Sequence, residues 1–118
     1  MTGSTALQQG DVVWAELPKR QPPGQEQHGR RPVVVVGLPQ LHQQLPHRLV
    51  VVVPLTRTNL RGPLCPSLQA GAGGLPAEST ALVHQVTAVD ERRIVGSLGR
   101  LAGTEFEPIR QGLLKLFS

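Results

Sequence analysis

Four side chains that can take part in acid–base or phosphate chemistry are crowded into one short segment, EQHGRRPVVVVG at residues 26–37. They are Glu26, His28, Arg30 and Arg31, and four consecutive valines follow them. Glutamate and histidine can transfer protons, and arginine binds phosphate through paired hydrogen bonds. The segment is either an ordinary solvated loop or a reactive site that a buried strand holds rigid.

The next valine-rich segment, residues 48–55, ends in a second polar cluster that contains Thr56, Arg57 and Thr58. If the two valine segments pair as antiparallel strands, the start of one lies beside the end of the other. An arginine and a threonine hydroxyl would then converge, which suits the stabilisation of negative charge on a phosphate. The alternative is two polar loops at opposite ends of a barrel.

The elements that must position these clusters are mainly strands. Valine runs without alternation indicate strands that are buried on both faces. We expect strands at 10–17, 32–38, 48–55 and 80–90, and a further strand after a turn within 91–99. Pro/Gly-rich segments at 18–31 and 60–79 predict loops, and 39–47 predicts a surface connection with at most one helical turn. Residues 1–9 are expected to form a flexible N-terminus ahead of a single domain at 10–118.

The last segment, TEFEPIRQGLLKLF at residues 104–117, has a helical pattern. Thr104 followed three residues later by Glu107 resembles a capping box, and Pro108 would lie in the first turn, where its missing N–H matters little. Apolar residues then recur at helical spacing: Phe106, Ile109, Leu113 and Leu116 or Phe117. The fold class is therefore mainly β (α+β), a small antiparallel β-barrel with a C-terminal helix.

Composition limits the classes of function. The chain has 118 residues and a net charge of +4, and residues 1–61 carry all of that excess, with seven Lys/Arg against three Asp/Glu. A basic surface suits a polyanion such as RNA or DNA, although a generally basic protein would look the same.

One cysteine, Cys65, and four scattered histidines make no metal-ligand pattern, so we expect no metal and no cofactor. The sequence has no apolar run long enough for a bilayer and no signal-peptide pattern, which fits a cytoplasmic protein without a membrane partner.

Aromatic residues are too few for a platform that stacks several bases. They are Trp14, Phe106 and Phe117, and there is no tyrosine. Trp14 lies in the first predicted strand, so we expect it to belong to the core rather than to a base-stacking site.

The order and spacing of several motifs resemble the MazF/PemK family of toxin endoribonucleases. The motifs are GDVVWAELP, EQHGRRPVVVVG, VVVPLTRT and ALVHQVTAVDERRI, and the resemblance runs from about residue 10 to the C-terminus. It implies a small SH3-like barrel with a C-terminal helix that forms a homodimer. It also implies cleavage of single-stranded RNA, often mRNA, within short sequences and without a metal, and neutralisation by a cognate MazE-like antitoxin.

The resemblance assigns roles to particular residues. Arg31 and Thr56 match the family's catalytic pair, and Glu26 matches the glutamate that supports the site, either as the base or by orienting Arg31. The chain departs from many relatives at His28 and at His84, the residue before Gln85 of the Leu-x-x-Gln segment. The residues that we expect to contact RNA are His28, Arg30, Arg57, Thr58, Arg61, His84 and Gln85.

The implied reaction uses the 2′-hydroxyl of the RNA as the nucleophile and leaves a 2′,3′-cyclic phosphate and a 5′-hydroxyl. A non-catalytic barrel is the alternative, either a nucleic-acid-binding module or a gyrase-poisoning toxin. The gyrase-directed barrels act through C-terminal aromatic residues including a tryptophan, whereas this chain ends LLKLFS.

Overall fold

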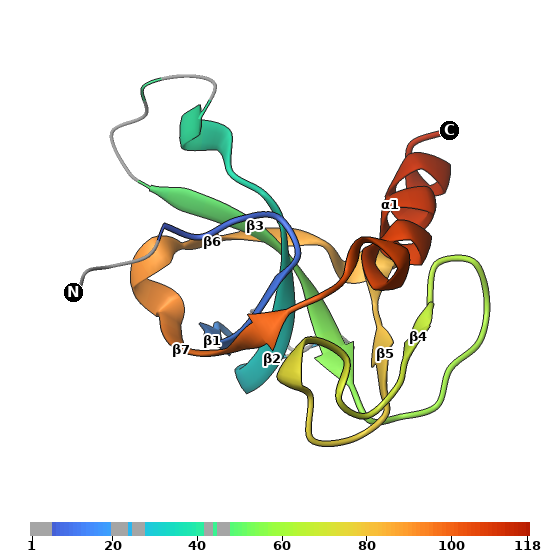
Figure 1. Cartoon of the computed structure of the whole chain (residues 1–118). Helices are drawn as coiled ribbons and strands as arrows, with labels where there is room; N and C mark the ends of the chain where they lie inside the picture. The colour runs from blue at the N-terminus through green and yellow to red at the C-terminus, as the bar shows by residue number, and fades with distance from the viewer. Residues whose placement is uncertain (1–5, 20–23, 25–27, 42–43, 45–47) are drawn as a thin grey trace.

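The structure is a computed structural model, and it describes residues 6–19, 24, 28–41, 44 and 48–118. Seven strands and one α-helix make up most of it (Figure 1). The strands are β1 (Asp11–Leu17), β2 (Gly29–Gly37), β3 (Leu49–Thr56), β4 (Ser67–Leu68), β5 (Ser79–Ala81), β6 (Thr87–Asp90) and β7 (Ile94–Arg100). The helix α1 spans Gly103–Leu116, and four 3-10 turns are η1 (Pro39–Leu41), η2 (Ala72–Gly74), η3 (Val83–Gln85) and η4 (Glu91–Arg93).

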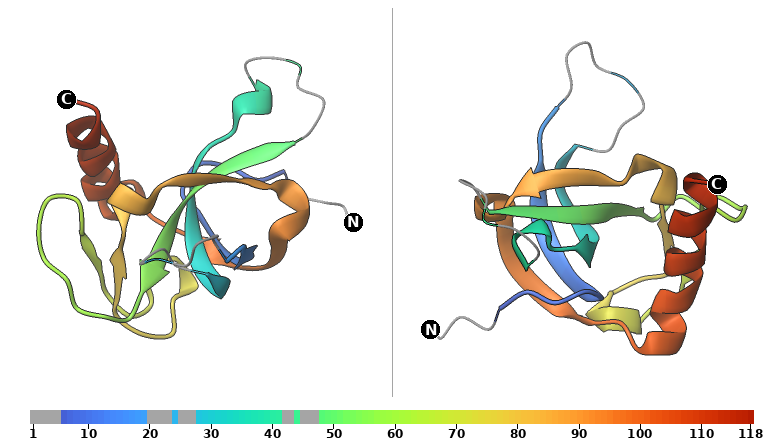
Figure 2. Two further views of the ribbon diagram at one scale, coloured as in Figure 1. Left: turned by 180° about the vertical axis from the view of Figure 1, so that it is seen from behind. Right: turned by 90° about the horizontal axis from the view of Figure 1, so that it is seen from above.

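The strands form one strongly curved sheet in which every pairing is antiparallel. The order is β4-β5-β3-β2-β1-β7, and β6 pairs with β3 beside β5. Strand β3 is therefore shared, since its first half pairs with β6 and its last two residues pair with β5. The sheet curls into a half-barrel, and α1 covers one side of it (Figure 2). The predicted class, a mainly antiparallel β-barrel with a C-terminal helix, is confirmed.

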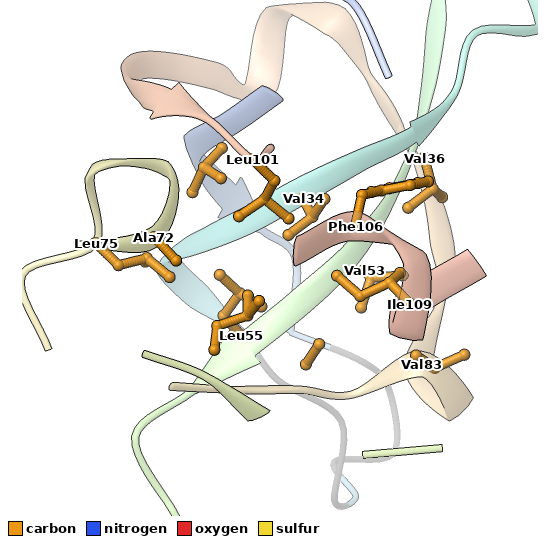
Figure 3. Close-up of a cluster of buried hydrophobic side chains, with 13 residues drawn as sticks. Val34, Val36, Val53, Leu55, Ala72, Leu75, Val83, Leu101, Phe106 and Ile109 are labelled. Carbon is orange, nitrogen blue, oxygen red and sulfur yellow. The ribbon is translucent and has the colours of Figure 1, made fainter. Parts of the chain in front are cut away.

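The two faces of the central strands bury two separate apolar clusters, which explains the uninterrupted valine runs. Val33 and Val35 of β2 face one cluster, whereas Val34 and Val36 face the other. The second cluster also includes Phe106 and Ile109 of α1 (Figure 3). Its other buried members are Val12, Val53, Leu55, Leu68, Ala72, Leu75, Ala81, Val83 and Leu101. The polar ends of β2 and β3 are thus mounted on strands that are buried on both sides.

Three of the predicted segments differ from the structure. Residues 80–90 are not one strand, because the chain pairs with the end of β3 as β5, turns through η3, and pairs with the start of β3 as β6. The loop predicted at 18–31 ends earlier than expected, because β2 begins at Gly29 and already contains Arg30 and Arg31. In the loop predicted at 60–79, the structure forms the short strand β4, the turn η2 and the first residue of β5.

The predicted cap of the C-terminal helix is displaced by two residues. The carboxylate of Glu105, not Glu107, accepts a hydrogen bond from the backbone N–H of Ala102 at 2.7 Å. Alanine has no side-chain acceptor, so only half of a capping box is present. Arg110 and Gln111 both donate to Glu107, and these bonds, that of Arg110 foremost, lower the pKa of the Glu107 carboxyl.

The predicted position of Pro108 in the first turn is also wrong, since Pro108 is the sixth residue of α1. An exposed proline at this point removes one hydrogen bond inside the helix. The apolar stripe itself is confirmed, because Phe106 and Ile109 are buried and Leu113 and Leu116 pack against the core. Phe117 lies beyond the helix with 79% of its surface exposed. Among the described residues, no helix has the length and apolar character that crossing a bilayer requires.

A close approach of two backbones fixes the loop between β4 and β5. Gly74 has φ +81°, and a Cβ added there would overlap the carbonyl oxygen of Leu98 on β7. A Cβ added at Gly99 would meet the carbonyl oxygen of Gly73 at 2.8 Å. Only residues without side chains permit this contact, which holds the following segment, Leu75–Ser79, against the sheet.

We expect Gly74→Ala to lower the free energy of unfolding by more than about 2 kcal/mol. The positive φ costs about 1–2 kcal/mol for any L side chain, and the overlap with Leu98 adds about 1–3 kcal/mol of overpacking. Gly71→Ala is the matched control, because Gly71 has φ +93° but no atom within 4 Å of the added Cβ. Chemical denaturation of both variants measures the difference, and equal losses would contradict the backbone contact.

Candidate functional site

The register of the sheet brings the two polar clusters together. Strand β2 pairs with β3 so that Val33 lies opposite Pro54 and Val34 opposite Val53. Continued by two residues, this register places Arg31 across from Thr56. The prediction that the two valine strands run antiparallel is confirmed, and the start of β2 does lie beside the end of β3 (Figure 1).

Arg31 is exposed, and its guanidinium is oriented by the backbone. Its Nε donates to the carbonyl oxygen of His28 at 3.1 Å. No carboxylate of the described residues forms an ion pair with Arg31. This contact engages Nε, and the two terminal nitrogens have no hydrogen bond to the described residues. A planar guanidinium suits two oxygens of one phosphate.

The Thr56 hydroxyl is held by the chain that follows it. The Oγ1 atom accepts a hydrogen bond from the backbone N–H of Thr58 at 3.2 Å. With a lone pair engaged in this turn, the hydroxyl proton remains available as a donor. Thr56 is half-buried at the last position of β3, so the group is both fixed and accessible.

Arg31 and Thr56 line the same hollow, which has a volume of about 340 Å³. Its polar lining residues are Arg30, Arg31, Thr56, Arg57, Thr58 and Ser79. Its other lining residues are largely apolar, and they are Trp14, Pro32, Leu55, Leu75, Pro76 and Ala77. The volume lies near the lower end of the range for small-ligand sites, about 300–1,000 Å³. Within the described part of the chain, this lining contains two hydroxyl-bearing threonines and three arginines but no carboxylate or imidazole.

Arg30 differs from Arg31 in having a carboxylate partner. It lies across from Glu16 of β1, and its Nη2 is 2.9 Å from Glu16 Oε1. Both side chains are largely exposed, so the pair contributes little to stability. The contact orients Arg30 along the rim of the hollow and reduces the positive charge there.

The remaining predicted residues lie in different places. Arg57 and Thr58 line the hollow, whereas Arg61 is exposed and does not. His84 and Gln85 lie in η3, which contacts α1 and contributes nothing to the lining of the hollow. His28 is exposed and supplies its backbone carbonyl to Arg31. Glu26 lies outside the described residues.

Sequence reasoning placed Trp14 in the core, and the structure corrects this. Trp14 is half-buried, belongs to neither apolar cluster and lines the hollow. The reason is its neighbours, since Trp14 lies between Pro32 of β2 and Gly96 of β7. Hydropathy could not reveal this, because cross-strand neighbours are set by register.

No three His, Cys, Asp or Glu side chains of the described residues lie close enough together to hold a metal ion. The cationic and hydroxyl groups of the hollow are instead suited to bind phosphate oxygens directly.

Comparisons with known proteins identify one protein family, and the match covers nearly the whole length of the chain. Residues 8–117 match the family of PemK-like, MazF-like toxins of type II toxin–antitoxin systems. Among solved structures, MazF from Deinococcus radiodurans is 22% identical with a TM-score of 0.76, and the match covers 97% of this chain and 98% of that chain. A MazE–MazF complex from the same bacterium is 23% identical, with a TM-score of 0.72 and 97% of each chain covered. An endoribonuclease from Mycobacterial species, crystallised with its cognate antitoxin, is 18% identical with a TM-score of 0.72, and 95% of each chain is covered.

Proposed function

Because the chain belongs to the family of PemK-like, MazF-like toxins of type II toxin–antitoxin systems, we propose that it is an endoribonuclease that cleaves single-stranded RNA, including mRNA. The observation that supports this most directly is that Arg31 and Thr56, from the start of β2 and the end of β3, line one hollow. Cleavage within short RNA sequences would inhibit translation and growth, which is the effect of a toxin.

The proposed reaction is an internal phosphoryl transfer. The ribose 2′-oxygen forms a bond to the adjacent phosphorus and loses its proton to a base. The bond from phosphorus to the 5′-oxygen breaks, and that oxygen takes up a proton. The products are a 2′,3′-cyclic phosphate and a 5′-hydroxyl, so no external nucleophile is consumed, and we propose that the reaction needs no metal.

Arg31 and Thr56 have distinct tasks in this reaction. Negative charge grows on the non-bridging oxygens as the 2′-oxygen attacks, and the terminal nitrogens of Arg31 stabilise it. The Thr56 hydroxyl donates a further hydrogen bond to the same phosphate. The described lining of the hollow contains no carboxylate or imidazole. We propose Glu26 for the supporting role that the family resemblance gives it, either as the base or by orienting Arg31.

The remaining proposed contacts are made to parts of the RNA on either side of the reacting phosphate. Arg57 and Thr58 bind the backbone inside the hollow. The side chains of His28, Arg30, Arg61, His84 and Gln85 contact nucleotides farther along the strand. These assignments follow from charge and hydrogen-bonding capacity, and from the position of each group outside or at the rim of the hollow.

The test is incubation of the protein with a long single-stranded RNA in the presence of EDTA. Discrete fragments with 5′-hydroxyl and 2′,3′-cyclic phosphate ends are expected, and mapping their ends identifies the cleaved sequence. Intact RNA under these conditions would contradict the proposal and favour a non-catalytic barrel.

Binding of RNA should weaken as salt increases. The logarithm of the association constant falls linearly with the logarithm of salt concentration, with a slope of about −0.7 per phosphate neutralised on a single strand. We expect Arg57→Gln to flatten this slope by about 0.7. Arg110→Gln is the control, because Arg110 lies on α1 and pairs with Glu107. Equal slopes for the Arg57 variant and wild type would show that Arg57 does not neutralise a phosphate of the bound RNA.

We also propose that the protein works as a homodimer, is bound by a MazE-like antitoxin and acts in the cytoplasm. The surface of α1 supports an association, since Leu114 is 56% exposed and Phe117 is 79% exposed. Strand β3 provides little apolar surface for a dimer interface, because Val50, Val52 and Val53 are fully buried within the protein. Light scattering during gel filtration measures the oligomeric state, and a concentration-independent monomer would contradict the dimer.

A further inference from the structure

The hollow beside Arg31 and Thr56 is also lined by apolar residues that phosphate binding does not use. Pro32, Leu55, Leu75 and Pro76 are among them, and Trp14 contributes an aromatic residue. Ser79 beside them is engaged locally, since its hydroxyl donates to the carbonyl oxygen of Ala77 at 3.1 Å. A ligand that fills the whole hollow therefore has an anionic part and a flat or apolar part, as a nucleotide does.

Trp14 is placed unusually for a strand tryptophan. The residues before it, Val12 and Val13, are at most 1% exposed, whereas Trp14 is only half-buried and joins neither apolar cluster. On β7 its neighbour is Gly96, which has no side chain to cover the ring, and a Cβ there would lie 3.4 Å from Trp14 Cδ1. A large apolar ring that its own fold leaves partly uncovered is available to a ligand.

The sheet is irregular at this point. The pairing of β1 with β7 shifts register between Val12 and Val13 and again between Trp14 and Ala15. The second shift leaves Val95 without a partner on β1, and Val95 is 46% exposed. Bulges of this kind bend a strand and re-aim neighbouring side chains, and they are common beside active sites. The two shifts bracket the segment that carries Trp14.

We infer that Trp14 is a base-stacking residue, and that the apolar lining of the hollow contacts one unstacked nucleobase of the RNA adjacent to the phosphate bound by Arg31 and Thr56. This inference rests on the proposed function and deepens it. Every base has a π-face, so stacking on an indole tolerates sequence and supplies affinity of about 1–3 kcal/mol per base. Trp14 binds and positions the nucleotide, while the groups that act on the phosphate are Arg31 and Thr56.

Intrinsic fluorescence tests the inference directly, because Trp14 is the only tryptophan in the chain. The probes are short homopolymeric oligodeoxynucleotides, which lack the 2′-hydroxyl and are not cleaved by the proposed reaction. Stacking should quench the indole emission upon binding. An abasic oligomer of the same length and charge should bind without quenching. Equal quenching by the abasic oligomer, or no change with any bound oligodeoxynucleotide, would overturn the inference.

Substitutions separate stacking from packing. Trp14→Leu keeps apolar volume but removes the π-face, and it should lower kcat/KM for RNA cleavage about 5- to 150-fold, mainly through KM. Trp14→Phe keeps a smaller π-face and should retain most of the activity. If both variants lose activity equally while remaining folded by circular dichroism, Trp14 acts by packing and the inference is wrong. If wild type quenches with bases but cleaves no RNA, the proposed function fails and base stacking stands.

Discussion

Arg31→Ala should lower kcat for RNA cleavage about 10²- to 10³-fold, the largest effect expected of any single substitution in the described site. The guanidinium lines the same hollow as Thr56 and is the proposed charge-stabilising group, and removal of one such donor from an active site typically costs this much. Because Arg31 is exposed and its one described hydrogen bond is to the His28 carbonyl, the variant should fold normally. Initial rates on a short RNA that contains one mapped cleavage site measure the effect.

Two controls sharpen the result for Arg31. Arg31→Lys keeps the charge but cannot bind two phosphate oxygens while also holding the His28 carbonyl, so its rate should lie between those of wild type and Arg31→Ala. Arg30→Ala removes the neighbouring arginine, which is paired with Glu16, and should reduce the rate far less. If the two alanine variants lose activity equally, general loss of positive charge explains the effect and the specific role of Arg31 is refuted.

Thr56→Val should lower kcat about 10- to 100-fold, the second largest effect. Valine has the same shape as threonine but no hydroxyl, and a hydrogen bond to a charged group is worth about 1.5–3 kcal/mol. Thr56→Ser keeps the donor and also the acceptor for the Thr58 N–H, so it should stay close to wild type. A Thr56→Ser variant as slow as Thr56→Val would show that the methyl group matters rather than the hydroxyl.

The loss at Thr56 has a structural component that stability measurements can separate. In Thr56→Val the backbone N–H of Thr58 loses its acceptor, but this N–H is exposed and can bond to water. The free energy of unfolding should therefore change by less than about 1 kcal/mol, and urea denaturation of both variants checks this.

Much of the fold could be predicted because the apolar pattern is strong. The valine runs of β2 and β3 identify two strands buried on both faces, and Phe106 and Ile109 lie at helical spacing. The pattern fails at 80–90, where apolar and β-branched residues on both sides of Val83–Gln85 suggest one strand although the chain turns there. The turn takes up surplus chain, because Ala81 pairs with Leu55 and Thr87 pairs with Val52. Five residues, 82–86, therefore lie opposite only two residues of β3, and a regular strand cannot hold the extra three.

The candidate site could be predicted in part. Arg31 and Thr56 stand beside recognisable strands, so antiparallel pairing alone brings them together. The sequence does not indicate that Arg30 pairs with Glu16, or that Trp14 faces the hollow, because both depend on the register of β1 against β2 and β7. The wall formed by Leu75 and Pro76 depends on a glycine contact to β7 that no local pattern predicts.

The contact of Gly73 and Gly74 with β7 separates two parts of the chain that both line the hollow. Arg31 and Thr56 belong to strands in the centre of the sheet, whereas Pro76 and Ala77 belong to a loop that begins where this contact ends. Substitutions or insertions after Leu75 can therefore reshape what the hollow accepts without moving the groups that act on the phosphate. The sheet therefore fixes the residues that act on the phosphate. The loop that follows Gly74 can vary and can change which ligand the hollow accepts.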